Sequence, residues 1–260
     1  MNCRFCSQSG FNSTEIEHYP FMSGEELESI VSDWEPYPVG RCGIVTSGGA
    51  LTDRDVEKLA QFIESRAAAG KKHPKICGSL GRLKHAAIER LQQAGLTRLH
   101  HNLETSEQFY PNICTTQTWR DRLDTVHQAQ EHGLSVCSGG LFGLGETWED
   151  RIDFALQLKA EGIHNIPMNF LYPHPGTPLA NQPVMPAEEA LRIIALFRHL
   201  LPAATLRICG GRTSVLKERQ YEMFAAGANA FMTGNYLTIS GAGVEVDLAK
   251  LKELGLEIEE

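Results

Sequence analysis

Short apolar segments alternate with amphipathic segments along nearly the whole chain. In the amphipathic segments, apolar residues such as Val56, Leu59 and Ile63 recur three and four positions apart, which is the spacing of one helix face. Ser23 and Glu26 have the spacing of a capping box at a helix start. The pattern predicts helices over residues 23–34, 52–69, 84–94, 118–132, 148–160, 187–200, 215–226 and 247–254, and strands over residues 41–46, 75–80, 97–103, 134–142, 164–172, 205–209 and 229–232.

This regular alternation is typical of a parallel sheet with right-handed crossovers, in a doubly wound sheet or in a TIM-type barrel. Polar and glycine-rich residues follow three of the strands, at 47–49, 102–105 and 138–140. In a barrel they would lie at the carboxyl end of the strands, where active sites are built. Because seven strands are accounted for, we expect an α/β (β/α)8 TIM-type barrel that lacks its first strand in this chain, as a single domain over residues 1–260.

Composition narrows the class of protein further. The chain has 260 residues, a formal net charge of −8 and 42% hydrophobic residues, which is ordinary for a globular protein. The acidic balance argues against nucleic acid and anionic membranes as partners. No apolar run reaches the roughly 18 residues of a membrane span, and no signal peptide is recognised, so we expect a cytoplasmic protein.

The seven cysteines are an odd number, which favours metal binding or catalysis over a disulfide framework. Cys3 and Cys6 form a C-x-x-C pair. Alone, this pair is weakly specific, because zinc ribbons need a second such pair and a thioredoxin-type pair follows a strand. Two free thiols remain an alternative interpretation.

Other cysteines fall on alternate strands. Counting a missing first strand, Cys77 lies on the third strand, Cys137 on the fifth, and Arg207 and Cys209 share one face of the seventh. Side chains from alternate strands form common layers inside a barrel, so these groups could converge and hold an iron–sulfur cluster. Alternatively, each cysteine packs as a small buried hydrophobe. Cys114, in a predicted loop, receives no role.

Several longer stretches carry a family resemblance. Residues 3–9 resemble the last two cysteines of the motif C-x-x-x-C-x-aromatic-C and their surroundings. Further matching stretches are residues 102–112, 122–124, 136–147, 176–179, 226–229 and 234–238. Through these motifs the chain resembles the biotin synthase family of radical S-adenosylmethionine (SAM) enzymes over essentially its whole length. The resemblance implies a radical SAM barrel.

The resemblance implies roles for residues near SAM. Cys3 and Cys6 would hold a [4Fe–4S] cluster with one iron open to SAM, and Phe5 would pack near the adenine. Glu104 would meet the ribose, and Arg122 would pair with the SAM carboxylate. The remaining implied positions are the turn Ser47, Gly48 and Gly49 for the SAM amino group, Asn102 and Asn169 for SAM or substrate, and Thr238 near the substrate's ureido ring.

The same resemblance implies that Cys77, Cys137 and Arg207 are three of the four ligands of an auxiliary cluster, normally [2Fe–2S]. This agrees with the convergence expected from alternate strands. The implied activity is sulfur insertion that converts dethiobiotin to biotin, with an electron donor such as flavodoxin or ferredoxin and a homodimeric enzyme. No side chain is assigned as a catalytic acid or base, because unactivated C–H bonds require radical chemistry that cofactors supply.

Three departures from the family pattern stand out. The leading cysteine of the radical SAM motif would fall just before Met1, so we expect a truncated chain or a misplaced start. Gly43 replaces the remaining auxiliary ligand, and Cys42 would face the opposite way. We therefore expect Cys209 to join the auxiliary cluster. Ile239 replaces a second threonine of the substrate pair.

These departures leave two other functions open. One is a related radical SAM enzyme with a different substrate and no sulfur insertion, which Gly43 and Ile239 favour. The other is a non-catalytic iron–sulfur remnant. A TIM-barrel hydrolase is disfavoured, because no nucleophile–base set is evident and the pair His100 and His101 has no acidic metal-binding partner at helical spacing.

Overall fold

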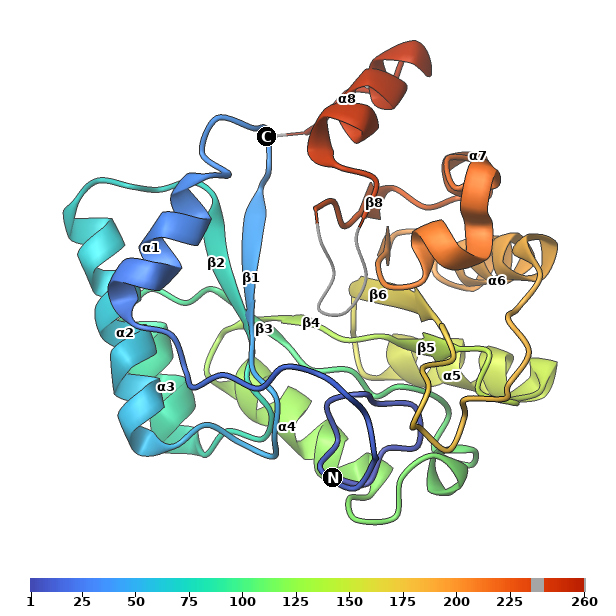
Figure 1. The fold of residues 1–260 in the computed structure, drawn as a ribbon, viewed down its shortest axis with the longest axis horizontal. Coiled ribbons are helices and arrows are strands. Elements are labelled where there is room, and N and C mark those ends of the chain that lie inside the picture. Colours follow the sequence, from blue (N-terminus) through green and yellow to red (C-terminus); the bar gives the residue numbers. More distant parts are fainter. Residues whose placement is uncertain (235–240, 260) are drawn as a thin grey trace.

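One curved sheet runs through the computed structural model, which describes residues 1–234 and 241–259 (Figure 1). All strand pairings are parallel, along the order β1-β2-β3-β4-β6-β7-β8, with β5 also paired to β6. The strands are β1 (Arg41–Val45), β2 (Lys75–Ser79), β3 (Arg98–His100), β4 (Ser135–Cys137), β5 (Gly140–Phe142), β6 (Asn165–Phe170), β7 (Thr205–Ile208) and β8 (Ala230–Phe231). This open arrangement confirms the predicted partial TIM-type barrel.

Helices cover the outer, convex side of the sheet (Figure 1). The α-helices are α1 (Gly24–Ser32), α2 (Asp53–Ala68), α3 (His85–Gln93), α4 (Trp119–Glu131), α5 (Trp148–Ala160), α6 (Ala187–Leu200), α7 (Glu222–Ala225) and α8 (Val244–Glu253). The short 3-10 helices are η1 (Tyr110–Asn112) and η3 (Lys217–Arg219), and η2 (Arg212–Leu216) is a π-helical turn. Within the described residues, no helix is both long and apolar enough to cross a bilayer.

Alternation along the strands separates two faces of the sheet. The outer-face residues are buried beneath the helices; they include Ile44, Ile76, Leu99, Val136, Ile166 and Leu206. The intervening residues point to the concave side, which we call the inner face. Helix starts follow the predicted chemistry: Ser23, Thr118 and Thr147 each form a complete capping box.

The predicted strand over residues 134–142 is wrong as a single element, because it divides into β4 and β5 at Ser138 and Gly139. The Gly139 N–H donates to the Asn102 side-chain oxygen at 3.2 Å instead of joining the sheet ladder. A Cβ on Gly139 would lie 2.0 Å from the Pro167 carbonyl oxygen. The division therefore follows from a close approach that only glycine permits.

The predicted helix over residues 215–226 is also wrong as a continuous element. The chain there forms η2, η3 and the four-residue α7. Gly211 has φ 81° and Lys217 has φ 51°, and neither value continues a right-handed helix. Apolar spacing alone did not reveal these two backbone reversals.

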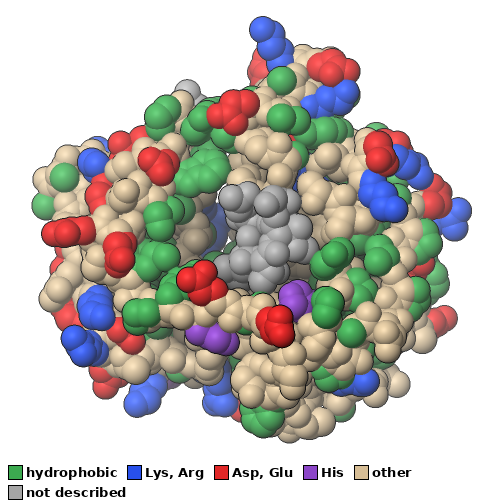
Figure 2. All heavy atoms as spheres, in the orientation of Figure 1, with side chains coloured by type: hydrophobic (Ala, Val, Ile, Leu, Met, Phe, Trp, Pro, Cys, Tyr) green, Lys and Arg blue, Asp and Glu red, His purple; other side chains and the backbone are tan. Residues whose placement is uncertain are grey.

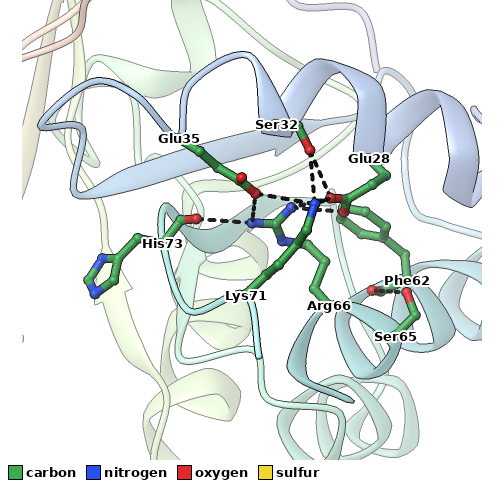
Figure 3. Close-up of polar contacts among 8 residues, drawn as sticks. All are labelled: Glu28, Ser32, Glu35, Phe62, Ser65, Arg66, Lys71 and His73. Carbon is green, nitrogen blue, oxygen red and sulfur yellow. Dashed lines mark hydrogen bonds and ion pairs between the residues drawn. The ribbon is translucent and has the colours of Figure 1, made fainter. Parts of the chain in front are cut away.

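One buried arginine ties α1 to α2 (Figure 3). Arg66 Nη1 donates to both Glu28 carboxylate oxygens, at 2.9 and 2.8 Å, and its Nη2 donates to Glu35 Oε1 at 3.3 Å. Nη2 also donates to the His73 carbonyl oxygen at 3.0 Å. Lys71 Nζ donates to Glu28 Oε1 at 2.6 Å. We call these five residues the Arg66 cluster.

Candidate functional site

The loop that carries Cys3 and Cys6 is held by one side-chain amide. Asn12 Nδ2 donates to the Cys3 and Cys6 carbonyl oxygens at 3.1 and 2.8 Å. The Arg4 N–H donates to the Ile113 carbonyl oxygen at 2.9 Å. Burial raises the pKa of the Cys3 thiol to about 12 and also raises the pKa of Cys6. Both side chains are thiols at neutral pH, so a metal that binds them displaces protons.

Cys114, which the sequence left without a role, lies directly against Cys3. Both side chains are buried, and each thiol acts on the pKa of the other. The Cys114 thiol also donates to Asn2 Oδ1 at 3.4 Å, and the Thr115 N–H donates to the same oxygen at 2.9 Å. No local sequence pattern predicts this contact, because it joins segments far apart along the chain.

Three residues predicted to meet SAM lie together beyond the carboxyl end of β3. Arg122 Nη1 is 3.4 Å from Glu104 Oε1 and donates to the Asn102 carbonyl oxygen at 2.8 Å. Asn102 Nδ2 donates to Glu104 Oε2 at 3.3 Å. Burial raises the pKa of Glu104, and the Arg122 charge opposes that rise. Tyr110, which sequence reasoning missed, fixes Arg122 by accepting from its Nε at 2.8 Å.

Glu104 also has an unusual backbone. Its φ is 74°, a region that few residues other than glycine adopt. The Leu141 N–H donates to its carbonyl oxygen at 2.9 Å, and a Cβ on Gly140 would lie 2.2 Å from that oxygen. Glycine at 140 therefore lets β5 approach this strained turn. Such strain concentrates at functional sites.

The predicted SAM turn at Ser47, Gly48 and Gly49 follows the carboxyl end of β1. Gly48 has φ 105°, which suits glycine, and the Gly49 carbonyl oxygen accepts from the Arg82 N–H at 2.8 Å. Phe5 is half-buried and packs against the hydrophobic core. The turn is thus anchored, and its polar backbone remains exposed at the same end of the sheet as Glu104.

Asn169, near the carboxyl end of β6, is held by its two neighbours in the sheet. Its Nδ2 donates to the Gly140 carbonyl oxygen at 3.1 Å, and its Oδ1 accepts from the Gly210 N–H at 2.9 Å. These two hydrogen bonds fix the orientation of the Asn169 side-chain amide. Thr238 and Ile239, the remaining positions considered for substrate binding, lie outside the described residues.

Deeper along the inner face, the structure brings together Cys77, Cys137 and Arg207 from alternate strands. Arg207 Nη2 donates to the Cys137 Sγ. Burial raises the pKa of Cys77 and of Cys137, and the Arg207 charge acts against both shifts. Gly43 lies opposite Cys77 in the β1–β2 register, and a Cβ there would lie 3.7 Å from the Cys77 Sγ. A side chain at position 43 would therefore point at this group.

Two further cysteines lie near this group, and their side chains are on opposite faces of the sheet. Cys209 is buried on the Arg207 side; its thiol donates to the Arg207 carbonyl oxygen at 3.5 Å. Burial raises its pKa, and the Arg207 and Cys137 charges both act on it. Cys42 packs against the hydrophobic core on the same strand face as Ile44. Only Cys209 thus accompanies the inner-face group.

The donor set fits an iron–sulfur cluster better than a single metal ion. Thiolates are the ligands of such clusters, and Arg207 supplies a cation beside them. In residues 1–234 and 241–259, no group of three His, Cys, Asp or Glu side chains is placed to hold a metal ion. A multinuclear group reaches ligands that are spaced more widely than one ion can.

Comparisons with known proteins give a consistent result. Residues 1–158 match the family model described as the radical SAM superfamily, and residues 167–257 match the biotin and thiamin synthesis associated domain. The chain is 53% identical over 259 residues to biotin synthase of Desulfovibrio desulfuricans, covering 100% of this chain and 81% of that protein. It is 44% identical over 258 residues to biotin synthase of Endomicrobium trichonymphae, covering 99% and 79%.

Solved structures show a similar fold at low sequence identity. Methylornithine synthase superposes with a TM-score of 0.82 at 18% identity, covering 100% of this chain and 79% of that one. The [FeFe]-hydrogenase maturase HydG from Carboxydothermus hydrogenoformans gives a TM-score of 0.79 at 18% identity, covering 98% and 63%. At such identities the similarity concerns the fold alone.

Proposed function

Since this chain belongs to the biotin synthase family of radical SAM enzymes, we propose that it converts dethiobiotin to biotin by sulfur insertion. The family uses a [4Fe–4S] cluster, SAM and an auxiliary iron–sulfur cluster. The observation that carries the proposal for this chain is the inner-face group of Cys77, Cys137 and Arg207. Sulfur insertion needs a sulfur donor, and these thiols with their cation supply the ligands of a cluster that could be that donor.

When bound, the [4Fe–4S] cluster supplies the electron that makes a 5′-deoxyadenosyl radical from SAM. The residues of this chain bind and orient the cluster, SAM and the substrate. Cys3 and Cys6 ligate the cluster. Arg122 offers the SAM carboxylate a buried cation already aligned by Tyr110. Glu104, fixed by Asn102 and Arg122, offers the ribose an acceptor. Phe5, Ser47, Gly48 and Gly49 complete the proposed SAM contacts, and Asn169 and Thr238 those to the substrate.

In the auxiliary site we assign Cys77, Cys137, Cys209 and Arg207 as ligands. Gly43 supplies no donor atom, and Cys42 points into the core. Mössbauer spectra with iron and sulfide analysis of Cys209→Ala test this assignment. Loss or conversion of the auxiliary signal supports it, whereas an unchanged signal contradicts it. Cys42→Ala is the matched control, expected to keep the signal.

Anaerobically reconstituted protein tests the activity, with the upstream region that would carry the leading cysteine of the radical SAM motif restored. With dethiobiotin, SAM and a reductant, we expect both biotin and 5′-deoxyadenosine. Deoxyadenosine without biotin would favour the second candidate, a related radical SAM enzyme that does not insert sulfur. Gly43 is the observation that favours it, because it removes a side chain aimed at Cys77.

The proposal also includes the setting of the reaction. We place it in the cytoplasm, with flavodoxin or ferredoxin as electron donor and a homodimer as the working form. We treat residues 1–260 as one barrel domain. The continuous sheet supports this, because β6 pairs with β4 and β5 across the boundary between the two matched family models.

A further inference from the structure

The strands have an unusual charge balance. Among the described residues, the eight strands contain no aspartate and no glutamate, although the chain carries a net charge of −8. Carboxylates are exposed on the face drawn in Figure 2, both at its outline and toward its centre. The strands do contain four cationic residues: Arg41, Lys75, Arg98 and Arg207.

Three of these four cations share one face and one end of the sheet. Arg41, Lys75 and Arg98 are the first residues of β1, β2 and β3, and Arg41 is opposite Lys75 in the register. Because Cys77 lies on the inner face, Lys75 two residues earlier lies there too. Arg41 is paired with Lys75, two residues before Cys77, and Arg98 is paired with Ser135, two residues before Cys137, so both arginines lie next to the auxiliary site.

These half-buried arginines, Arg41, Arg98 and Arg207, lack the carboxylate partners that the fully buried arginines have. In the described residues, none of the three forms an ion pair with a carboxylate. Arg41 Nη1 donates to Thr97 Oγ1 at 3.1 Å, Arg98 Nε donates to Ser135 Oγ at 3.2 Å, and Arg207 donates to the Cys137 thiol. Elsewhere, Arg66, Arg122, Arg151 and Arg212 each pair with a carboxylate.

Their mutual repulsion is therefore uncompensated. Burial lowers the pKa of Arg41, and the Arg98 charge lowers it further. His100, next along the inner face from Arg98, carries no negative charge in either protonation state, so it cannot offset the arginines. All three arginines remain partly accessible, so a small solute can reach them.

We propose that Arg41, Lys75 and Arg98, at the amino end of the inner face, bind a small inorganic anion, hydrosulfide, beside Cys77 and Cys137. The choice of hydrosulfide rests on the proposed function, since each sulfur inserted into product leaves the auxiliary site one sulfide short. The site holds the anion without covalent change. Guanidinium and ammonium donors suit it, because hydrogen bonds between a cation and an anion are stronger than those between neutral groups.

Calorimetric titration of the metal-free 260-residue chain with sodium hydrosulfide, under anaerobic conditions and fixed ionic strength, tests the site directly. We expect saturable binding with one site per chain. The variant Arg41→Gln/Arg98→Gln should bind at least about tenfold more weakly, because two charge-assisted hydrogen bonds are lost. Arg41→Lys/Arg98→Lys should recover part of the affinity. Arg192→Gln, on the exposed face of α6, should bind like the original chain.

Three outcomes would overturn the proposal: no saturation by the original chain, equal affinity in the glutamine variant, or an equal loss in Arg192→Gln. Sulfate provides a further arm, because it is inert toward thiols. If sulfate competes with hydrosulfide, a shared anion site is supported. If sulfate binds at the arginines and hydrosulfide does not, the assignment of hydrosulfide is wrong.

A single-turnover biotin assay separates this proposal from the proposed function. Absent biotin formation with intact hydrosulfide binding contradicts the function and leaves the anion site standing. Normal single-turnover biotin with no hydrosulfide binding contradicts only the anion site.

Discussion

Two clusters that contain buried or half-buried arginines have opposite surroundings in this protein. In the Arg66 cluster, one guanidinium meets two carboxylates and a carbonyl oxygen, and its side chain is only 3% exposed (Figure 3). On the inner face, the side-chain partners that the structure shows for Arg41, Arg98 and Arg207 within residues 1–234 and 241–259 are hydroxyl groups and a thiol, with no carboxylate among them. The first group is complete within the fold. The second keeps its charge available for a ligand, so the partners of a buried cation separate structural from functional roles.

The largest expected effect is the loss of Cys137, the thiol paired with Arg207. Cys137→Ala should abolish sulfur insertion, reducing biotin formation by more than the roughly 10–100-fold typical of residues that merely support a ligand. Single-turnover biotin measurements check this. Cys42→Ala, on the opposite face of the sheet in β1, should remain active. Comparable activity in Cys137→Ala and Cys42→Ala would contradict a functional role for the inner-face group.

Removing Arg66 should instead weaken the fold. Arg66→Gln leaves Glu28 and Glu35 without their shared cation. We expect a loss of about 2–3 kcal/mol in the free energy of unfolding, below the value for a fully buried pair because both carboxylates keep some solvent. Urea unfolding measures this, with Arg192→Gln expected to be near neutral. A change as small as that of the control would contradict a structural role for the cluster.

Low pH should remove the stabilisation that the Arg66 cluster provides. Burial would raise the pKa of Glu28, but hydrogen bonds from Lys71 and Arg66 outweigh it and lower the pKa to about 2. Its stabilisation is therefore complete above the unfolded value near 4.5 and is lost as the pH falls toward 2. The stability difference between the original chain and Glu28→Gln should shrink from pH 6 to pH 3. A constant difference would mean that Glu28 acts through packing.

The smallest expected effect is on the inner face. Arg98→Gln should change the free energy of unfolding by less than about 0.5 kcal/mol, because it removes repulsion along with one hydrogen bond to Ser135. Urea unfolding alongside Arg66→Gln gives the comparison. A loss as large as that of Arg66→Gln would show that both arginine groups stabilise the fold.

The sequence predicted what depends on local periodicity. Helix and strand order followed from apolar spacing and from caps such as Ser23 with Glu26. The meeting of Cys77, Cys137 and Arg207 followed from the two-residue alternation of strands and the layers of a barrel. Apolar spacing, helix caps and strand alternation recur along the chain, so they can be recognised from residues that are close together in sequence.

The features that the sequence did not predict depend on contacts between distant segments. The break between β4 and β5 arises where Gly139 meets Pro167, and the Cys3–Cys114 contact joins the first loop to the segment after η1. The carboxylate partners of Arg66 also come from another helix and the segment beyond it. The spacing of residues along the chain does not show which carboxylate pairs with which cation.

The amide of Asn12 has a consequence for how quickly iron is captured. By holding the Cys3 and Cys6 carbonyls together, it keeps the loop in one shape before any iron arrives. The search through loop conformations is thus complete beforehand, and the rate of capture should rise in proportion to iron concentration. Without that amide, capture would wait for the loop to close, and the rate would level off at high iron.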